Sequence, residues 1–402
     1  MRTWMERSAG FAFMLLLAIA LGATAPSAAP RPQAGATVAM TRIPGHFVPL
    51  HSEPLSPAVR AAAERGDPAA ALAMAHAYLT GQGVARDVAQ AVQWLDRAAA
   101  AGSADAMQDL GLLLSEGRGR PADLDAAFAW WQKSVAAGST SAEAELGQAY
   151  LFGDGVEQDV TAGLQHLRLA AEAQVGRADF ILGNLYAHGF GPVASDHARA
   201  LSYFRAGAGL GDADCEAQLG WMYGTGFQLH HDRAQAVRWY RAAAEQGNAV
   251  GEYGLADHYA YGRGVPKDLP TAEHWYQLAA DQGHADAAYN LALYLGHAVK
   301  GRPGPPDWEQ AAKYFTEAAQ QGIYDAQCML GQLYAQGAGE PKDPVVALHW
   351  MLLSLEGSQR CAQREPGLAA ALSAPERDRA QALAAAFQPV PHIFTYGRYA
   401  DH

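Results

Sequence analysis

The stretch that decides the fold is GNAVGEYGLADHYAYGRGVPKDLPTAEHWYQLAADQG, residues 247–283. It holds two segments rich in helix-forming residues, separated by a glycine turn at residues 262–264. Asp268 follows this turn, and its carboxylate is a favourable N-cap for a second helix. The stretch therefore predicts one helix–turn–helix unit of about 36 residues.

The same unit recurs along the chain. An insertion near residues 303–306 lengthens the seventh unit, and the eighth ends near Gly357. A fixed period of this length predicts an array of helical hairpins, each packed on its neighbours. The boundary glycines are Gly66, Gly102, Gly138, Gly211, Gly247, Gly283 and Gly322.

An apolar anchor occupies the first helix of every unit, and the next residue is always Gly or Ala. Glycine inside a helix costs roughly 1 kcal/mol relative to alanine, so this pattern predicts that another backbone comes close there. The anchors are Met74, Leu110, Leu146, Leu182, Leu219, Leu255, Leu291 and Leu330.

An aspartate begins the second helix of every unit, where it is expected to cap the helix. An aromatic or histidine residue follows seven positions later, and we expect it to interlock with small residues of neighbouring helices. The aspartates are Asp87, Asp123, Asp159, Asp196, Asp232, Asp268, Asp307 and Asp343. The aromatic column contains Trp94, Trp130, His166, Tyr203, Trp239, Trp275, Tyr314 and Trp350.

These columns resemble the Sel-one-like repeat family, a relative of the tetratricopeptide repeats. The resemblance covers residues 66–357 and is densest at Leu255, Ala256, Tyr259, Gly262, Gly264, Val265, Asp268, Ala272, Trp275, Ala279, Ala280 and Gly283. It implies an all-α fold, an α/α superhelical solenoid of about eight repeats with a concave face lined by first helices. It also implies a non-enzymatic scaffold or adaptor for protein–protein interaction, without a cofactor.

Outside the repeats, composition predicts the remaining organisation. Arg2, Arg7 and the apolar run Phe11–Leu21 indicate a signal peptide over residues 1–25. A flexible Pro/Ala-rich linker is expected over 26–55, an N-terminal capping helix over 56–65, a C-terminal capping helix region over 358–388 and a tail over 389–402. The expected location is periplasmic or secreted; the alternative is an anchor formed by an uncleaved N-terminal helix.

Charge and motifs exclude several function classes. The net charge of −12 disfavours binding to nucleic acid and to anionic lipid. The glycine turns lack the Gly-Lys-Ser/Thr of a phosphate loop, and His230-His231 lacks a third metal ligand. The sequence therefore predicts no catalytic, cofactor-binding or metal-binding residues.

The three cysteines, Cys215, Cys328 and Cys361, leave two alternatives. Cys328 and Cys361 would pair in an oxidising compartment if both lie on first helices of adjacent units. Otherwise all three are buried thiols that pack as small apolar residues.

Partner-binding residues are predicted two positions before or after the anchor, on the side of the first helix that faces away from the core. There the chemistry changes from unit to unit, and large aromatics stand beside polar groups, as in interface hot spots. The alternative is that these rings wedge between adjacent first helices as part of the core. The expected partner is a protein; the alternative function is a glycan or cell-wall-associated scaffold in polysaccharide export or envelope assembly. The candidates are Phe180, Asn184, Trp221, Tyr253, Asp257 and Tyr289.

Overall fold

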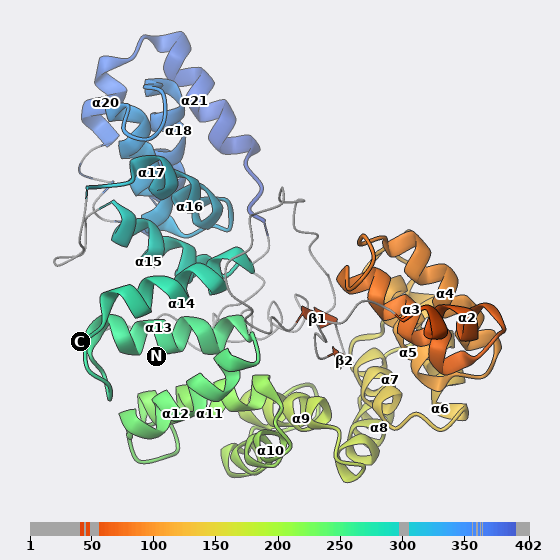
Figure 1. Cartoon of the computed structure of the whole chain (residues 1–402). Coiled ribbons are helices and arrows are strands. Elements are labelled where there is room, and N and C mark those ends of the chain that lie inside the picture. Colours follow the sequence, from red (N-terminus) through yellow and green to blue (C-terminus); the bar gives the residue numbers. More distant parts are fainter. Residues whose placement is uncertain are drawn as a thin grey trace. The chain divides into compact units, whose positions relative to one another are not determined.

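The computed structural model describes residues 41–43, 46–48, 56–296, 305–355, 357, 358, 361, 363 and 365–390. Figure 1 shows consecutive helices through these ranges, and the predicted all-α solenoid of eight helix pairs is confirmed. The chain divides into two compact units. Unit 1 holds residues 1–231 and 245–247, and unit 2 holds residues 232–244 and 248–402.

Each repeat contributes a first and a second helix. The first helices are α3 (Pro68–Thr80), α5 (Ala104–Ser115), α7 (Ser141–Phe152), α9 (Gly176–His188), α11 (Ala213–Thr225), α13 (Ala249–Tyr261), α15 (Ala285–Leu295) and α17 (Tyr324–Gln336). The second helices are α4 (Val88–Ala100), α6 (Leu124–Ala136), α8 (Val160–Glu172), α10 (His197–Gly209), α12 (Arg233–Glu245), α14 (Leu269–Asp281), α16 (Trp308–Gln320) and α18 (Pro344–Ser354).

The predicted aspartate caps are confirmed in all eight repeats. Each carboxylate accepts a backbone N–H two or three residues later, at the start of the second helix. The turn before the cap needs left-handed glycines, and Gly155 has a φ of 70°. A Cβ on Gly155 would collide with the carbonyl of Leu124, so the missing side chain lets this turn lie against the start of α6.

The expected close approach of a backbone at the small residue after the anchor is confirmed in two repeats: a Cβ on Gly147 would lie 3.0 Å from the carbonyl oxygen of Gly163, and one on Gly331 would lie 2.9 Å from that of Ala347. A large side chain of the second helix also reaches this position. A Cβ on Gly183 would overlap the ring of Phe204, and one on Gly147 would overlap Leu167. These contacts come from the residue eight positions after the capping aspartate, which is buried in every repeat. This buried column contains Leu95, Trp131, Leu167, Phe204, Tyr240, Tyr276, Phe315 and Met351.

The two ends of the repeat array are covered differently. In unit 1, α2 (Pro57–Glu64) begins at Ser56, whose hydroxyl accepts from Val59 N, and buries Ala63. In unit 2, α20 (Glu365–Ala371) precedes α21 (Ala374–Ala386), which starts with the predicted capping box of Ser373 and Glu376. Leu372 and Ala380 pack with Val345 and Leu348 of α18. These contacts cover the last hairpin with apolar side chains.

A disulfide joins Cys328 on α17 to Cys361, which lies ahead of α20. The alternative of three free thiols is therefore wrong, and Cys215 carries a buried free thiol. The bridge closes a loop with a sequence separation of 33 residues. In the chain-entropy account, a loop of this length contributes about 3–4 kcal/mol.

Two short strands lie in the segment expected to be a flexible linker. β1 (Thr41–Ile43) pairs antiparallel with β2 (His46–Val48). The predicted signal peptide over residues 1–25 and most of the tail, residues 391–402, lie outside the described residues. Within the described ranges, every helix is too short or too polar to cross a membrane.

Candidate interaction surface

The first-helix face comprises the side chains within two positions of each anchor and those that contact them. In unit 1 it is joined from repeat to repeat by polar contacts. His76 Nε2 lies 2.7 Å from Asp109 Oδ2, which links α3 to α5. Ser139 Oγ donates to Gln108 Oε1 at 3.3 Å, just before α7. Asp109 and Gln108 are each only 1% exposed. These two contacts therefore lie mainly in the interior between neighbouring repeats.

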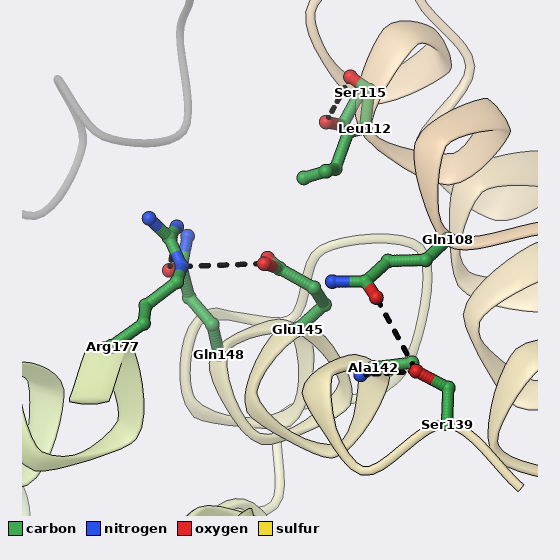
Figure 2. A network of polar contacts seen from close by, with 8 residues as sticks. All are labelled: Gln108, Leu112, Ser115, Ser139, Ala142, Glu145, Gln148 and Arg177. Carbon is green, nitrogen blue, oxygen red and sulfur yellow. Dashed lines mark hydrogen bonds and ion pairs between the residues drawn. The ribbon is translucent and has the colours of Figure 1, made fainter. Parts of the chain in front are cut away.

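A charged cluster continues this face between α7 and α9. Figure 2 shows Arg177 extending from α9 toward Glu145 and Gln148. Arg177 Nε lies 3.2 Å from Glu145 Oε1, and Nη2 donates to Gln148 Oε1 at 3.1 Å. The side chain of Glu145 is 3% exposed and that of Arg177 is 21% exposed. The guanidinium thus compensates a buried carboxylate while still facing solvent.

In the same region, the carboxyl group of Glu116 has a raised pKa. Burial raises the pKa of the Glu116 carboxyl above its ordinary value, and the Arg118 guanidinium at 3.2 Å acts in the opposite direction. Arg177 and Glu145 also act on this carboxyl, so the pairs Glu116–Arg118 and Glu145–Arg177 form one coupled set of charges. The set has no net charge when all four groups are ionised.

The candidates in unit 1 lie at different depths. Phe180 is buried, with its ring 6.4 Å from that of Phe204. Asn184 is also buried: its Nδ2 donates to the carbonyl of Phe180, and its Oδ1 accepts from Gln218 Nε2. Trp221 is half-buried beside Phe227, which is 38% exposed. The geometry supports packing for Phe180 and Asn184 and leaves Trp221 partly accessible.

The candidates in unit 2 lie on α13 and α15. Tyr253 stacks on His284 with ring centroids 4.5 Å apart. Asp257 is 9% exposed, accepts from Tyr276 Oη at 3.1 Å and pairs with Arg263 Nη1 at 3.1 Å. The half-buried Tyr289 has its ring 6.0 Å from that of Phe315. These contacts support the packing alternative for Tyr253 and Tyr289; a role for any of the six candidates in binding stays a prediction.

Three buried carboxyls recur at the position three residues before the anchor. Burial, and then the neighbouring Asp212 carboxylate, raises the pKa of Asp179 to about 6. Burial raises the pKa of Glu216 to about 7 despite the hydrogen bond from Gln246, and that of Glu252 to about 7 despite the bond from Gln282. Each carboxyl is therefore partly protonated near neutral pH.

Sequence reasoning missed the polar contacts of unit 1, above all Gln108, Glu145 and Arg177. A signal was present, because Asp109 and Glu145 directly precede the anchors Leu110 and Leu146. A charge beside a buried anchor needs a compensating partner. The partner of Glu145 lies 32 positions along the chain, so only the stacking of repeats identifies it.

The described part of the chain shows no group of three His, Cys, Asp or Glu side chains arranged to hold a metal ion. His230 and His231 lie together in the turn between α11 and α12, exposed to solvent. The polar groups of the first-helix face are instead engaged with one another.

The Sel1 repeat model matches residues 68–103, 104–139, 140–175, 176–212, 213–248, 249–284, 285–323 and 325–358. The chain belongs to the Sel1 repeat family. Members of this family are generally non-catalytic scaffolds for protein interaction. The eight matched segments follow the eight helix pairs, one segment to each.

Solved structures show the same likeness. A Sel1 repeat protein from Oxalobacter formigenes is 29% identical, with 77% of this chain and 89% of that chain covered and a TM-score of 0.50. A protective antigen with an SLR fold, present in uropathogenic Escherichia coli strains, is 27% identical, with 81% and 85% covered and a TM-score of 0.40. An immunity protein from Pseudomonas aeruginosa is 22% identical, with 54% and 81% covered and a TM-score of 0.40. No curated protein matches the chain.

Proposed function

We propose that this Sel1 repeat protein is an exported adaptor that binds a protein partner on the first-helix face of its repeats. The observation that carries the proposal is the combination of eight Sel1 repeats with a face whose chemistry changes along the chain. The Arg177–Glu145 pair and the Tyr253–His284 stack occupy this face in different repeats. A surface that differs between otherwise equal repeats suits selection of one partner.

Export is supported by the disulfide between Cys328 and Cys361, because such bonds persist in oxidising compartments and are rare in the cytosol. The basic and apolar character of residues 1–25 supports the same location. Alkylation of thiols in the unfolded, unreduced protein from intact cells provides a test. One reactive thiol is expected in the exported protein; three would contradict the oxidising compartment.

The binding proposal is tested by crosslinking in cells followed by mass spectrometry. We expect one protein to be recovered repeatedly with the full chain and to be lost in an Arg177→Ala, Gln148→Ala variant that retains its helical circular dichroism. Replacement of the exposed Arg86 and Gln158 by Ala is the control, because both lie in turns away from this face. Retention of the protein on purified polysaccharide, without any recurrent protein partner, would contradict the proposal.

A further inference from the structure

One position on the second helices carries arginine in three consecutive repeats. It lies nine residues after the capping aspartate, on the helix surface. The three arginines are Arg168, Arg205 and Arg241, whereas four other repeats carry Asp96, Gln132, Gln277 and Thr316 there. The run of arginines stands out because the chain as a whole has a net charge of −12.

Two arginines of this column, Arg168 and Arg241, donate to tyrosines of the following repeat. In unit 1, Arg168 Nη2 donates to Tyr186 Oη at 3.4 Å. In unit 2, Arg241 Nη2 donates to Tyr259 Oη at 3.0 Å. The same contact is therefore present in a repeat of each unit.

In unit 1 a second arginine joins this contact. The Arg199 guanidinium lies over the Tyr186 ring at 5.4 Å, and Tyr203 stacks on Tyr186 with centroids 5.7 Å apart. The hydrogen bond from Arg168 lowers the pKa of the Tyr186 phenol, as does its bond with Arg199. Tyr186 therefore positions two guanidinium groups from α8 and α10.

These guanidinium groups are open to a ligand. The Arg199 side chain is 63% exposed, although it also contacts Asp196 at 3.3 Å. Arg168 and Arg205 are exposed, and within the described residues neither has a carboxylate within ion-pair distance. An arginine has five N–H donors in a planar fork, so most donors remain available for carboxylate groups.

We propose that Arg168, Arg199 and Arg205, the basic patch of unit 1, form a docking surface for an acidic segment of a partner protein. The guanidinium groups bind Asp or Glu side chains of that segment through paired N–H donors. The contacts of Arg168 and Arg199 with Tyr186 reduce the entropy that these two side chains lose on binding. The inference rests on the proposed adaptor function. The positive charge of the three arginines selects an acidic occupant by charge complementarity.

The test measures binding of a fluorescein-labelled peptide of alternating Glu and Ala to the full chain by fluorescence anisotropy. The same peptide with Gln in place of Glu is the peptide control. Changing Arg168, Arg199 and Arg205 together to Gln is expected to weaken binding of the Glu peptide about tenfold. Added salt should weaken binding to the unchanged protein as well.

A matched protein variant separates the patch from general charge. Changing Arg65, Arg97 and Lys133 to Gln removes the same charge from exposed positions of unit 1 and should change the affinity less than about twofold. Equal loss in both variants, or no loss in the patch variant, would overturn the proposal. A second patch variant with Lys at all three positions keeps the charge and serves if the Gln variant does not fold; it should bind with intermediate affinity.

Two further outcomes identify the occupant. Patch-dependent binding of alginate, a polysaccharide of uronic acids, without binding of the Glu peptide would overturn the assignment to a protein segment. If the crosslinked protein partner is still recovered with the folded patch variant, the docking surface is wrong and the adaptor function stands. Loss of that partner in the patch variant, with recovery retained in the variant at Arg65, Arg97 and Lys133, supports both the docking surface and the adaptor function.

Discussion

The first-helix faces of the two units contrast in chemistry although the same hairpin builds both. In unit 1, Glu145 and Arg177 join neighbouring repeats through buried and half-buried charge. In unit 2, Tyr253 and His284 join them through stacked rings. The residues that define the hairpin, namely the anchor, the small residue and the capping aspartate, recur in both. Hairpin formation and face chemistry are therefore separable, and substitutions on each should have separable effects.

The largest effect is expected from the charge on the face of unit 1. Changing Arg177 to Met leaves the Glu145 carboxylate buried without its cation, and the free energy of unfolding should fall by about 3 kcal/mol. Urea unfolding followed by circular dichroism measures this loss.

Two variants serve as controls for that substitution. Changing Glu145 to Gln together with Arg177 to Met removes the uncompensated charge and should recover most of the stability. The Arg120–Asp96 pair is exposed on both sides, so Arg120→Met should change stability by less than about 0.5 kcal/mol. Equal losses at Arg177 and Arg120 would show that burial of Glu145 does not control the energetics of this face.

The aromatic face of unit 2 is tested by changing Tyr253 to Ala. Tyr253 packs against a cluster of buried side chains that includes Tyr276. The free energy of unfolding should therefore fall by about 2 kcal/mol. Trp221→Ala in unit 1 should cost about 1 kcal/mol, because Trp221 packs on the partly exposed Phe227. Thermal unfolding combined with partner crosslinking compares the variants. A stable Tyr253 variant that loses its partner would establish Tyr253 as an interface residue.

The contrast also shows which features the sequence could predict. Caps, turns and anchors follow local rules within one repeat, and Asp268 or Gly262 is recognisable without knowledge of any neighbour. The buried column from Leu95 to Met351 went unrecognised because any large side chain fills that space, so its chemistry varies.

Contacts between repeats were the other feature that the sequence did not predict. The pairing of Arg177 with Glu145 and of Cys328 with Cys361 joins residues more than 30 positions apart. For the cysteines, spacing alone left two alternatives open. The candidates Phe180 and Asn184 were placed by helical angle, which does not show how deeply the next repeat covers them.

A smaller effect is expected in the pH dependence of unit 2. Glu252 has a pKa of about 7 in the folded chain against an ordinary value of 4.5. The folded state thus binds more protons between these values, and the free energy of unfolding falls as the pH rises from about 4.5 through 7. Glu252→Gln should remove about 1–2 kcal/mol of this fall, seen in melting temperatures between pH 5 and 8. The exposed Glu309→Gln is the control, and an unchanged slope in the Glu252 variant would contradict the assignment.

The smallest effect belongs to the capping aspartates, which both units share. Asp268 accepts from Thr271 N at 3.2 Å and from Thr271 Oγ1 at 2.7 Å at the start of α14. Asp268→Ala removes both bonds and should cost about 1 kcal/mol, whereas Asp268→Asn retains the cap and should cost only a few tenths. Because the cap belongs to the hairpin and not to the face, partner recovery should be equal in both variants. Lost recovery in a folded Asp268→Ala protein would show that a residue common to all repeats also contributes to binding, which would break the separation between hairpin and face.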